Sequence, residues 1–529
     1  MVAINDPIQA GLQRGWKVVD ASTLQDSLSI ETDVVIIGTG AGGGISADLL
    51  SRAGLQVVLI EEGPLRSSQD FRMQEAQAYS DLYWDSAARK TEDKAINILQ
   101  GRTVGGSTTV NWTSCFRTPE STLQYWSERH GIHGYGSNDL APWFQEIEQR
   151  LNIAPWALNP NANNSLLQTG ANKLGITTQT MARNVKGCWN LGYCGMGCPT
   201  NAKQSMLVSC LPDALDRGAQ LFTRCRAWNF SHQNGKITQL NALALEANGL
   251  VPKTVTLRFK ARHFILAAGA INSPALLLRS KLPDPYQLTG TRTFLHPVVI
   301  SAALMPQPVQ AWQGAPQSVY TDHFLQRPFD GAMGFKLEAP PIHPVLFATT
   351  LQGFGAAHAD IMRQFAQVHA QLALMRDGFH EESPGGQVKL RSDGSGVLDY
   401  VLNDYFWRSA REALLAMAEI QFAAGAKKVY AVHESCSGYD SWQEAKQAIS
   451  TLPLKAGMTR VVSAHVMGGC RFGSNERDSV VQLDGRHWHV SNLSVHDGSL
   501  FPTSIGANPQ LSIYAMAARL SHQLQARLS

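Results

Sequence analysis

The stretch VVIIGTGAGGGISADLLSRAGLQVVLIE, residues 34–61, combines two short apolar runs with a glycine-rich loop and a helix-like segment. Residues 34–37 and 57–60 are unbroken apolar runs, which are typical of strands buried on both faces of a parallel sheet. The loop 38–44 leads into a helix-like stretch over 45–53 that a glycine ends. The segment therefore predicts a strand–turn–helix–strand unit and an α/β fold built around it.

The glycine loop fits a dinucleotide-binding pattern. Gly38 permits the tight turn, Gly40 lets the backbone approach a pyrophosphate, and Gly43 allows close packing of helix and strand. The helix N-terminus offers free N–H groups to the phosphates, and an acidic residue after the second strand can accept hydrogen bonds from ribose hydroxyls. The predicted dinucleotide contacts are Gly38, Thr39, Gly40, Ala41, Gly43 and Glu61. The motif alone does not separate FAD from NAD.

The bulk composition excludes several classes of protein. A chain of 529 residues is too long for one ordinary core, so two closely packed domains are expected. Charged residues make up 16% of the chain, against roughly 25% in average proteins. The formal net charge of +3 leaves no nucleic-acid footprint, and eight cysteines in this length do not form a disulfide scaffold.

The sequence shows no recognisable targeting or membrane-spanning segment. The N-terminal residues lack the apolar run of a signal peptide. No apolar stretch approaches the roughly 20 residues of a membrane span, and the nearest one, 264–278, is interrupted by Asn272 and Pro274. We therefore expect a cytoplasmic protein without a transmembrane segment, and the sequence leaves peripheral membrane association open.

Hairpin signals and the placement of motifs indicate two domains. Asn234-Gly235 is a strong hairpin turn in a β-meander that leads back to the nucleotide motifs, and Asp393-Gly394 marks a second hairpin. We predict a Rossmann-like cofactor domain with a β-meander, and an α+β substrate domain with an antiparallel sheet. The predicted boundaries are 32–130, 210–290 and 456–529 for the cofactor domain, 131–209 and 291–455 for the substrate domain, and 1–31 for an N-terminal lead-in.

Together with the glycine loop, three further motifs, the last of them in two parts, resemble the glucose–methanol–choline (GMC) oxidoreductases. Residues 105–112 (GGSTTVNW) are similar to the first signature of that family, and residues 269–274 (GAINSP) to the second. Residues 463–473 (SAHVMGGCRFG) and 497–508 (DGSLFPTSIGAN) are similar to its C-terminal active-site region. The resemblance spans most of the chain, and the order of the motifs makes it specific.

The resemblance implies an enzyme that binds FAD. Some members attach FAD covalently through a histidine just before the signature asparagine; Val110 stands there in this chain, so non-covalent FAD is expected. Carried over by motif, Ser107, Asn111 and Ser114 line the flavin side. The other implied cofactor contacts are Gly105, Gly106, Ala227 at the adenine, Ala268, and Asp497 at the ribityl chain.

Oxidation of an alcohol requires a proton acceptor, because the reaction removes a hydride from carbon and a proton from oxygen. An imidazole, with an unperturbed pKa of about 6.5, suits this task. The chain resembles family members with a histidine–asparagine pair, which implies His465 as the base and Asn508 as the group that holds the substrate oxygen. Asn508 and Pro509 also fit the start of a helix that an apolar stripe over 513–524 predicts, and both interpretations can hold.

Four other polar residues are weaker candidates. Glu338 loosely matches a glutamate that acts as a base on a substrate-roof strand in cholesterol-oxidase-like members, but the sequence favours a solvated strand carboxylate. His296 resembles a structural position after the second signature. His487 and His489 flank a tryptophan in a turn–strand segment, and we expect both at the surface.

Cys188, Cys194 and Cys198 lie together in a glycine-rich segment. Taken alone, three close cysteines suggest a metal or iron–sulfur site, but no fourth ligand is evident nearby. The segment resembles the cysteine- and glycine-rich stretch of long-chain fatty-alcohol oxidases and cholesterol-oxidase-like members. We therefore expect a structural turn near the flavin and no metal.

The likeness to these two subtypes implies a bulky or elongated apolar alcohol, oxidised to an aldehyde or ketone. The alternatives are a sterol-oxidase type of activity and a flavin-dependent, non-oxidative lyase. Dioxygen or another electron acceptor would reoxidise the flavin, and the sequence does not fix which. It does not fix the oligomeric state either.

Overall fold

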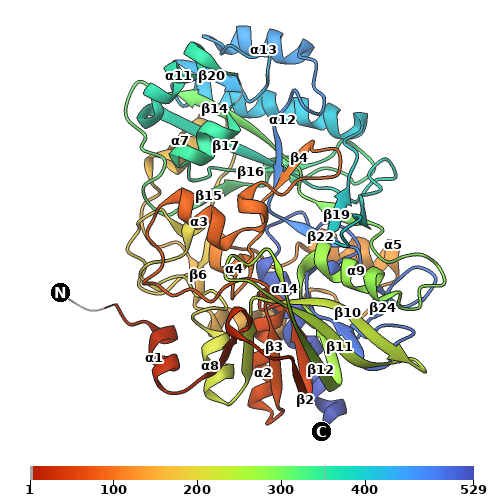
Figure 1. The fold of residues 1–529 in the computed structure, drawn as a ribbon. Coiled ribbons are helices and arrows are strands. Elements are labelled where there is room, and N and C mark those ends of the chain that lie inside the picture. Colours follow the sequence, from red (N-terminus) through yellow and green to blue (C-terminus); the bar gives the residue numbers. More distant parts are fainter. Residues whose placement is uncertain (1–3, 352) are drawn as a thin grey trace.

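The computed structural model describes residues 4–351 and 353–529, which form two large sheets, one below the other in Figure 1. The lower sheet has eight strands in the order β1-β9-β3-β2-β12-β11-β10, with β25 beside β12. Its strands are β1 Lys17–Asp20, β2 Leu28–Ile37, β3 Val57–Ile60, β9 Gln220–Thr223, β10 Cys225–Gln233, β11 Lys236–Leu245, β12 Pro252–Leu266 and β25 Leu493–Val495.

The lower sheet confirms the Rossmann-like fold with a β-meander. The neighbours from β1 to β12 run parallel, and so do β12 and β25. β10, β11 and β12 are antiparallel, with the predicted hairpin turn at Asn234 and Gly235. Residues 34–37 and 57–60 are buried, as continuous apolar runs in a parallel sheet require.

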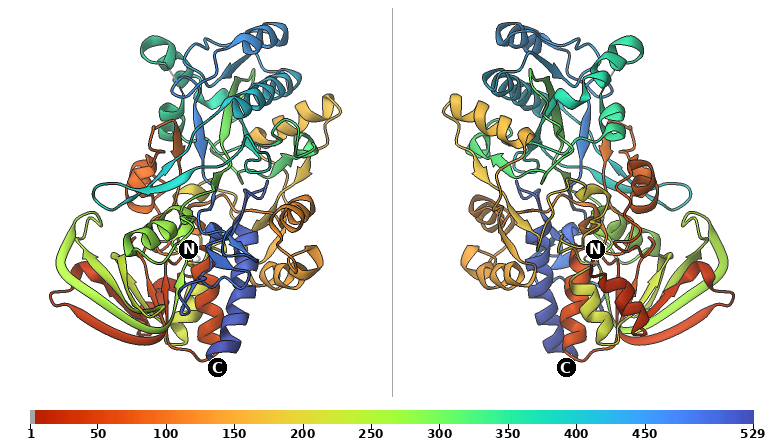
Figure 2. Two further views of the ribbon diagram at one scale, coloured as in Figure 1. Left: turned by 90° about the vertical axis from the view of Figure 1, so that its right-hand side faces the viewer. Right: turned by 90° about the vertical axis from the view of Figure 1, so that its left-hand side faces the viewer.

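A helix pair packs beneath this sheet. α2 (Ala41–Arg52) follows the glycine loop, and α14 (Gln510–Leu528) lies beside it, as both views in Figure 2 show. Gly42 allows α2 to approach the segment before α14, because an added Cβ would lie 1.5 Å from the carbonyl oxygen of His496. This contact brings the two ends of the chain together at one site.

The upper sheet also has eight strands, in the order β4-β21-β14-β17-β16-β15-β7, with β20 beside β14. Every pair except β4 with β21 is antiparallel. Its strands are β4 Ile96–Ile98, β7 Gln179–Thr180, β14 Val298–Leu304, β15 Val319–Thr321, β16 Phe335–Glu338, β17 Val368–Met375, β20 Lys428–Ala431 and β21 Val461–Ser463. α12 (Asp404–Ala423) packs on it, and α7 (Ala162–Lys173) and α13 (Trp442–Thr451) pack on α12 (Figure 1).

Several elements differ from the expectation. The lead-in 1–31 contributes β1 and the start of β2 to the lower sheet. α2 begins at Ala41 rather than at Ile45, because burial of its glycines against neighbouring backbone outweighs their low helix propensity. β4 and β21 belong to the upper sheet, although their residues fall within the predicted cofactor domain. The domain boundaries themselves stay a prediction.

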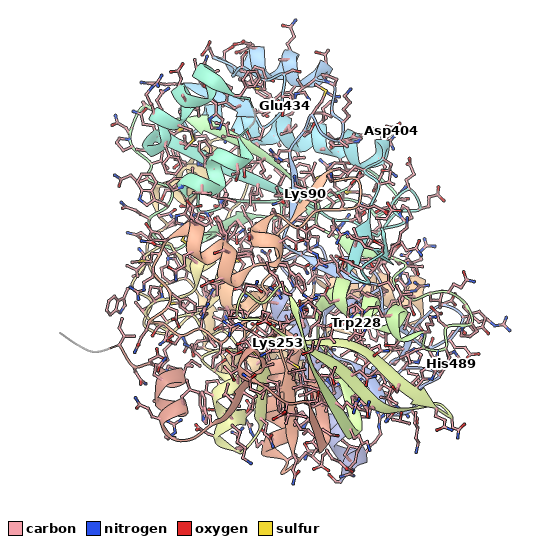
Figure 3. All side chains as sticks on the ribbon, in the orientation of Figure 1. Lys90, Trp228, Lys253, Asp404, Glu434 and His489 are labelled. Atoms are coloured by element: carbon pink, nitrogen blue, oxygen red, sulfur yellow. The ribbon has the colours of Figure 1, made fainter. Side chains whose placement is uncertain are left out.

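One expected surface residue is buried. The His487 side chain is 3% exposed, so its expected surface position is wrong; the polypeptide folds back there, and Val481 and His487 form a β-bridge. Burial lowers the pKa of His487 to about 4. His489 is half-buried near the edge of the molecule (Figure 3).

Among the described residues, no helix is both long and apolar enough to span a bilayer.

Candidate active site

A cavity of about 940 Å³ lies where the carboxyl ends of β2 and β3 meet the upper sheet. Ligands of open α/β sheets bind at this edge, where the strand order reverses. The predicted residues that line the cavity are Gly38, Thr39, Gly40, Ala41, Glu61, Gly106, Ser107, Asn111, Ser114, Ala227, Ala268, His465, Asp497 and Asn508. Its volume is of the size expected for a large organic ligand, roughly 300–1,000 Å³.

Gly43 and Gly105 lie behind the cavity wall rather than in it. The Gly105 N–H donates to the hydroxyl of Thr39 over 3.0 Å, and that hydroxyl donates to the Glu61 carboxylate over 2.6 Å. Gly63 N–H donates to the other carboxylate oxygen over 2.9 Å. Glu61 therefore fixes the loop around the cavity, and burial raises the pKa of its carboxyl group.

The N-terminus of α2 suits an anion. Gly40 is its N-cap residue and supplies no side-chain cap, and Gly40, Ala41 and Gly42 all line the cavity. The first N–H groups of a helix have no partner within the helix, so these amides are available to a pyrophosphate. An added Cβ on Gly106 would lie 2.7 Å from the Gly40 Cα, so two glycine loops touch at this point. The site therefore fits a dinucleotide.

A cationic and aromatic group that the sequence did not predict also lines the cavity. The guanidinium groups of Arg89 and Arg102 lie 4.9 and 5.1 Å from the ring centre of Trp84. Arg102 and Arg226 both pair with Glu62, over 3.1 and 2.9 Å. These residues come from four separate segments, so no local pattern in the sequence could have indicated the group.

Ala227 lies within β10, beside this cationic group, and its carbonyl oxygen accepts a hydrogen bond from Arg279 over 3.2 Å. In the first-signature segment, the Asn111 amide donates to the Gln510 side-chain oxygen over 2.7 Å. Gln510 in turn donates to the carbonyl oxygen of Ser114 over 2.8 Å. Gln510 therefore joins α14 to the first-signature loop, a role that its sequence position did not indicate.

Asp497 lines the cavity, but its carboxylate is engaged by the protein itself. One oxygen accepts from the Ser499 N–H over 2.8 Å and from the Ser499 hydroxyl. The other accepts from the Gly269 N–H over 2.8 Å and the Ser273 hydroxyl over 2.6 Å. Burial raises the pKa of this carboxyl group, and the four hydrogen bonds oppose that shift. Asp497 therefore ties the second signature to the C-terminal segment.

His465 and His296 face each other across two paired segments. β13 (Thr293–Leu295) pairs with β22 (Val466–Gly468), and β14 pairs with β21, so each histidine lies between two strands of its own segment. Their Nδ1 atoms are 3.0 Å apart. The structural position expected for His296 stays a prediction, and the structure adds that its ring contacts the candidate base. The sequence missed this contact because it depends on the pairing of segments far apart in the chain.

Both imidazoles are neutral at neutral pH. Burial, assisted by the nearby Lys336 charge, lowers the pKa of His465 to about 4. Burial, His465 and Lys336 also lower the pKa of His296. Lys336 is 3% exposed, and its Nζ lies 3.2 Å from the ring centre of Phe116. A neutral imidazole can accept a proton, which the candidate base requires.

Asn508 and Glu338 form a buried polar pair. The Asn508 amide donates to Glu338 Oε2 over 3.4 Å, and the Glu338 side chain is fully buried on β16. The expectation of a solvated carboxylate is therefore wrong, since strand pairing carries Glu338 to the inner face of the sheet. Asn508 is not the N-cap; Pro509 occupies that position, and Asn508 is free to face the cavity. Burial raises the pKa of Glu338 to about 6, against an opposing effect of Lys336.

The inner face of the upper sheet is apolar next to these groups. Val298 pairs with Leu374 and with Val462, so their side chains lie together; Val298 follows His296 by two residues, and Val462 precedes His465 by three. Five buried side chains form this cluster, against which Trp112 and Val462 pack: Val298, Ile300, Leu372, Leu374 and Val432. The cluster is separate from the two main cores, and several of its members line the cavity. We call it the apolar roof.

The cysteine-rich loop has free thiols at Cys188, Cys194 and Cys198. Within the described residues, no group of three or more histidine, cysteine or acidic side chains could hold a metal. The Cys194 sulfur lies 3.8 Å from a guanidinium nitrogen of Arg183, which is 1% exposed. The loop contacts the site through its backbone, because the Gly195 carbonyl oxygen accepts a hydrogen bond from the Tyr83 hydroxyl over 2.6 Å.

Comparison with protein families and known proteins gives consistent matches. A family model described as GMC oxidoreductase matches residues 77–298, and a second one with that description matches 382–517. Long-chain-alcohol oxidase FAO3 of Arabidopsis thaliana is 28% identical over 96% of this chain and 70% of its own length. An uncharacterised GMC-type oxidoreductase of Mycobacterium tuberculosis is 30% identical over 95% of this chain and 77% of its own length.

Solved structures share the fold. Pyridoxine 4-oxidase from Mesorbium loti superposes with a TM-score of 0.69 at 18% identity, over 93% of this chain and 99% of that one. Formate oxidase of Aspergillus oryzae superposes with a TM-score of 0.71 at 15% identity, over 95% and 99% of the two chains. At these identities the likeness shows the fold alone.

Proposed function

This chain belongs to the GMC oxidoreductase family and is an FAD-dependent oxidoreductase acting on CH–OH donors, and from that premise we propose that it oxidises a bulky or long-chain apolar alcohol to an aldehyde or ketone. The observation that carries the proposal is the apolar roof beside the pair of His465 and Asn508. The relatives named as alcohol oxidases support dioxygen as the final electron acceptor.

The cavity has the parts that FAD requires. The amides of Gly40, Ala41 and Gly42 would hold the pyrophosphate, and the backbone at Ala227 would meet the adenine. The flavin would lie beside the lining residues of the first signature and of the C-terminal region, which include Asn111, His465 and Asn508. Because the Asp497 carboxylate already accepts four hydrogen bonds, its contact with the ribityl chain would come from backbone atoms. FAD, when bound, supplies a hydride acceptor at flavin N5.

The apolar roof indicates the substrate class. Val298, Leu374 and Val462 offer aliphatic surface without hydrogen-bonding groups next to His465. A sugar or another polyol placed there would lose hydrogen bonds to water without replacing them, at a cost of about 1–3 kcal/mol for each unpaired group. Burial of an alkyl chain or a fused ring at this surface is instead favourable, with a free-energy gain of about 0.8 kcal/mol for each buried CH₂ group.

His465 accepts the hydroxyl proton of the alcohol in this proposal. Its Nδ1 faces the Nδ1 of His296, so only one of these two atoms carries the hydrogen between them. For Nε2 of His465 to accept a proton, its own Nδ1 must be the donor and His296 the acceptor. In this proposal His296 would accept that hydrogen and hold the ring of the base, which is an orienting role of the kind that a second residue has in many catalytic groups.

Asn508 and Glu338 would position the substrate oxygen and assist the proton transfer. Both the Asn508 Oδ1 and the Glu338 Oε1 atoms are buried without a hydrogen-bond partner among the described residues. An unsatisfied buried acceptor costs about 1–3 kcal/mol, so this side of the cavity favours a ligand that donates hydrogen bonds. The hydroxyl of an alcohol and a water molecule are both donors of that kind.

The proposed activity can be tested with the purified yellow protein. Aliphatic, aromatic and steroid alcohols are each mixed with it anaerobically, and loss of the flavin absorption band is followed. We expect medium- and long-chain or fused-ring alcohols to bleach the flavin and polyols to leave it oxidised. Equal bleaching by glucose and by a long-chain alcohol would contradict the substrate class, and bleaching by NADPH alone would contradict the reaction.

His465→Ala tests the base. We expect the rate of flavin reduction by a good alcohol to fall by about 10²- to 10⁴-fold, the range that one acid–base residue contributes, while FAD stays bound. His232→Ala, at an exposed position on β10, is the matched control and should reduce at the wild-type rate. Stopped-flow absorbance measures both, and reduction of the His465→Ala variant at nearly wild-type speed would refute the assignment.

The pH profile separates Glu338 from His465. Burial raises the pKa of Glu338 to about 6, so its carboxylate is lost as the pH falls through 6; His465, with a pKa of about 4, loses its neutral form only at lower pH. We expect the limiting rate of flavin reduction to fall below pH 6 in the wild type. In Glu338→Gln this fall should disappear. A fall near pH 6 that persists in the variant would exclude Glu338.

Non-covalent binding of FAD follows from Val110. This side chain lines the cavity where a histidine forms the covalent bond in some relatives, and a hydrocarbon side chain cannot form that bond. We expect acid precipitation to leave all FAD in the supernatant, as measured by absorbance of the two fractions. Yellow colour that stays with the precipitated polypeptide after washing would show a covalent link elsewhere.

A further inference from the structure

Lys203 is a buried lysine that the proposed chemistry does not use. Its side chain is 2% exposed, and its Nζ donates hydrogen bonds to three backbone carbonyl groups. These belong to Thr109 over 2.6 Å, Asn111 over 3.0 Å and Cys194 over 2.8 Å. An ammonium group has three donors, so all of them are used here.

The first two carbonyls lie at the end of a short helix. α4 (Ser107–Val110) is the helix of the first signature, and Asn111 is its C-cap residue. The last carbonyls of a helix have no partner within the helix, and a cation placed there is favourable. The Val110 carbonyl oxygen lies 3.4 Å from the Tyr83 hydroxyl, whose one hydrogen goes to the Gly195 carbonyl over 2.6 Å. Lys203 is therefore the donor from another segment for the carbonyls of Thr109 and Asn111.

The backbone is strained just after the carbonyl groups that Lys203 holds. Thr113 has a φ of 66°, in the left-handed region that β-branched residues rarely adopt, and it is fully buried. Such a conformation costs about 1–3 kcal/mol and persists only where neighbouring contacts enforce it. Lys203 holds the chain before Thr113, and Gln510 holds Asn111 and Ser114 on either side of it.

The strained segment forms one wall of the cavity. Residues 110–114 all line it. Any change in the backbone of Asn111 or Thr113 therefore moves the surface against which the cofactor and the alcohol would lie. A shift of about 1 Å in a site of this kind can cost about 10²-fold in rate.

We propose that Lys203 is a positioning residue that fixes the cavity wall 110–114, and that the cysteine-rich loop supports it through the backbone carbonyl of Cys194 rather than through thiol chemistry. The proposal rests on the assignment of this wall to the flavin side. It gives a role to the cysteine-rich segment, for which the described residues offer no metal site. It also explains why a charged side chain is buried here although no carboxylate among residues 4–351 and 353–529 hydrogen-bonds to it.

The test compares Lys203→Met with Lys253→Met. Met keeps the length of the side chain and removes the charge and the donors. Lys253, labelled in Figure 3, also donates to two backbone carbonyls, Ser22 and Leu24, both over 2.7 Å. Neither lysine lines the cavity itself, but Asn111, which Lys203 holds, lines it, whereas Ser22 and Leu24 do not. Both variants lose hydrogen bonds from a lysine to backbone carbonyl groups. A difference between them therefore shows the effect of where those hydrogen bonds lie, and not of lost stability alone.

We expect Lys203→Met to weaken FAD binding by about 10-fold or more, to shift the absorption bands of bound flavin, and to lower the limiting rate of flavin reduction by about 10- to 100-fold. Lys253→Met should match the wild type in all three readouts, whatever it loses in melting temperature. Cys194→Ser keeps the backbone carbonyl and should also match the wild type.

A Lys203→Met variant that loses melting temperature but keeps the wild-type flavin spectrum, FAD affinity and limiting rate would overturn the proposal. So would a Cys194→Ser variant as impaired as Lys203→Met. If Lys203→Met does not fold, Lys203→Gln is judged by the same readouts. The spectrum and the FAD affinity need no alcohol, so failure of the proposed function leaves this test intact.

Discussion

The buried carboxylate of Asp497 is the contact on which the geometry of the site depends. It joins the helix after β12 to the segment that leads to Asn508, through four hydrogen bonds that offset the cost of burying a charge. The same segment packs against Gly42 at a distance that allows no side chain there. The glycine loop, the second signature and the C-terminal segment are thus held as one unit, and the upper sheet closes over it.

Desolvation sets the charge state of the reacting groups. Burial beside the apolar roof lowers the pKa of His465 and raises the pKa of Glu338, because it favours the neutral form of each side chain. Lys336, on the same strand as Glu338, adds a positive charge that favours neutral imidazoles and an ionised carboxylate. A base that is free at neutral pH therefore follows from the position of the site between two sheets.

Local patterns predicted the parts of the molecule whose structure is decided by near neighbours. The buried strand segments 34–37 and 57–60, the two hairpins and the helix α14 all lie where the sequence placed them, because turn residues and apolar periodicity act over a few positions. The contacts of the site did not follow from such patterns. His296 reaches His465, and Glu338 reaches Asn508, only because strands of the upper sheet pair in one particular register.

The sequence by itself determined the nucleotide loop, the α/β architecture and, through ordered motifs, the GMC family, because each depends on residue types at short, fixed spacings. Only the tertiary structure decided which buried polar groups meet. Glu338 is fully buried rather than solvated, Lys203 and Gln510 hold the first-signature loop from distant segments, and His487 is covered by a folded-back chain. The physical reason is that burial and hydrogen bonding depend on long-range packing, which spacing along the chain does not encode.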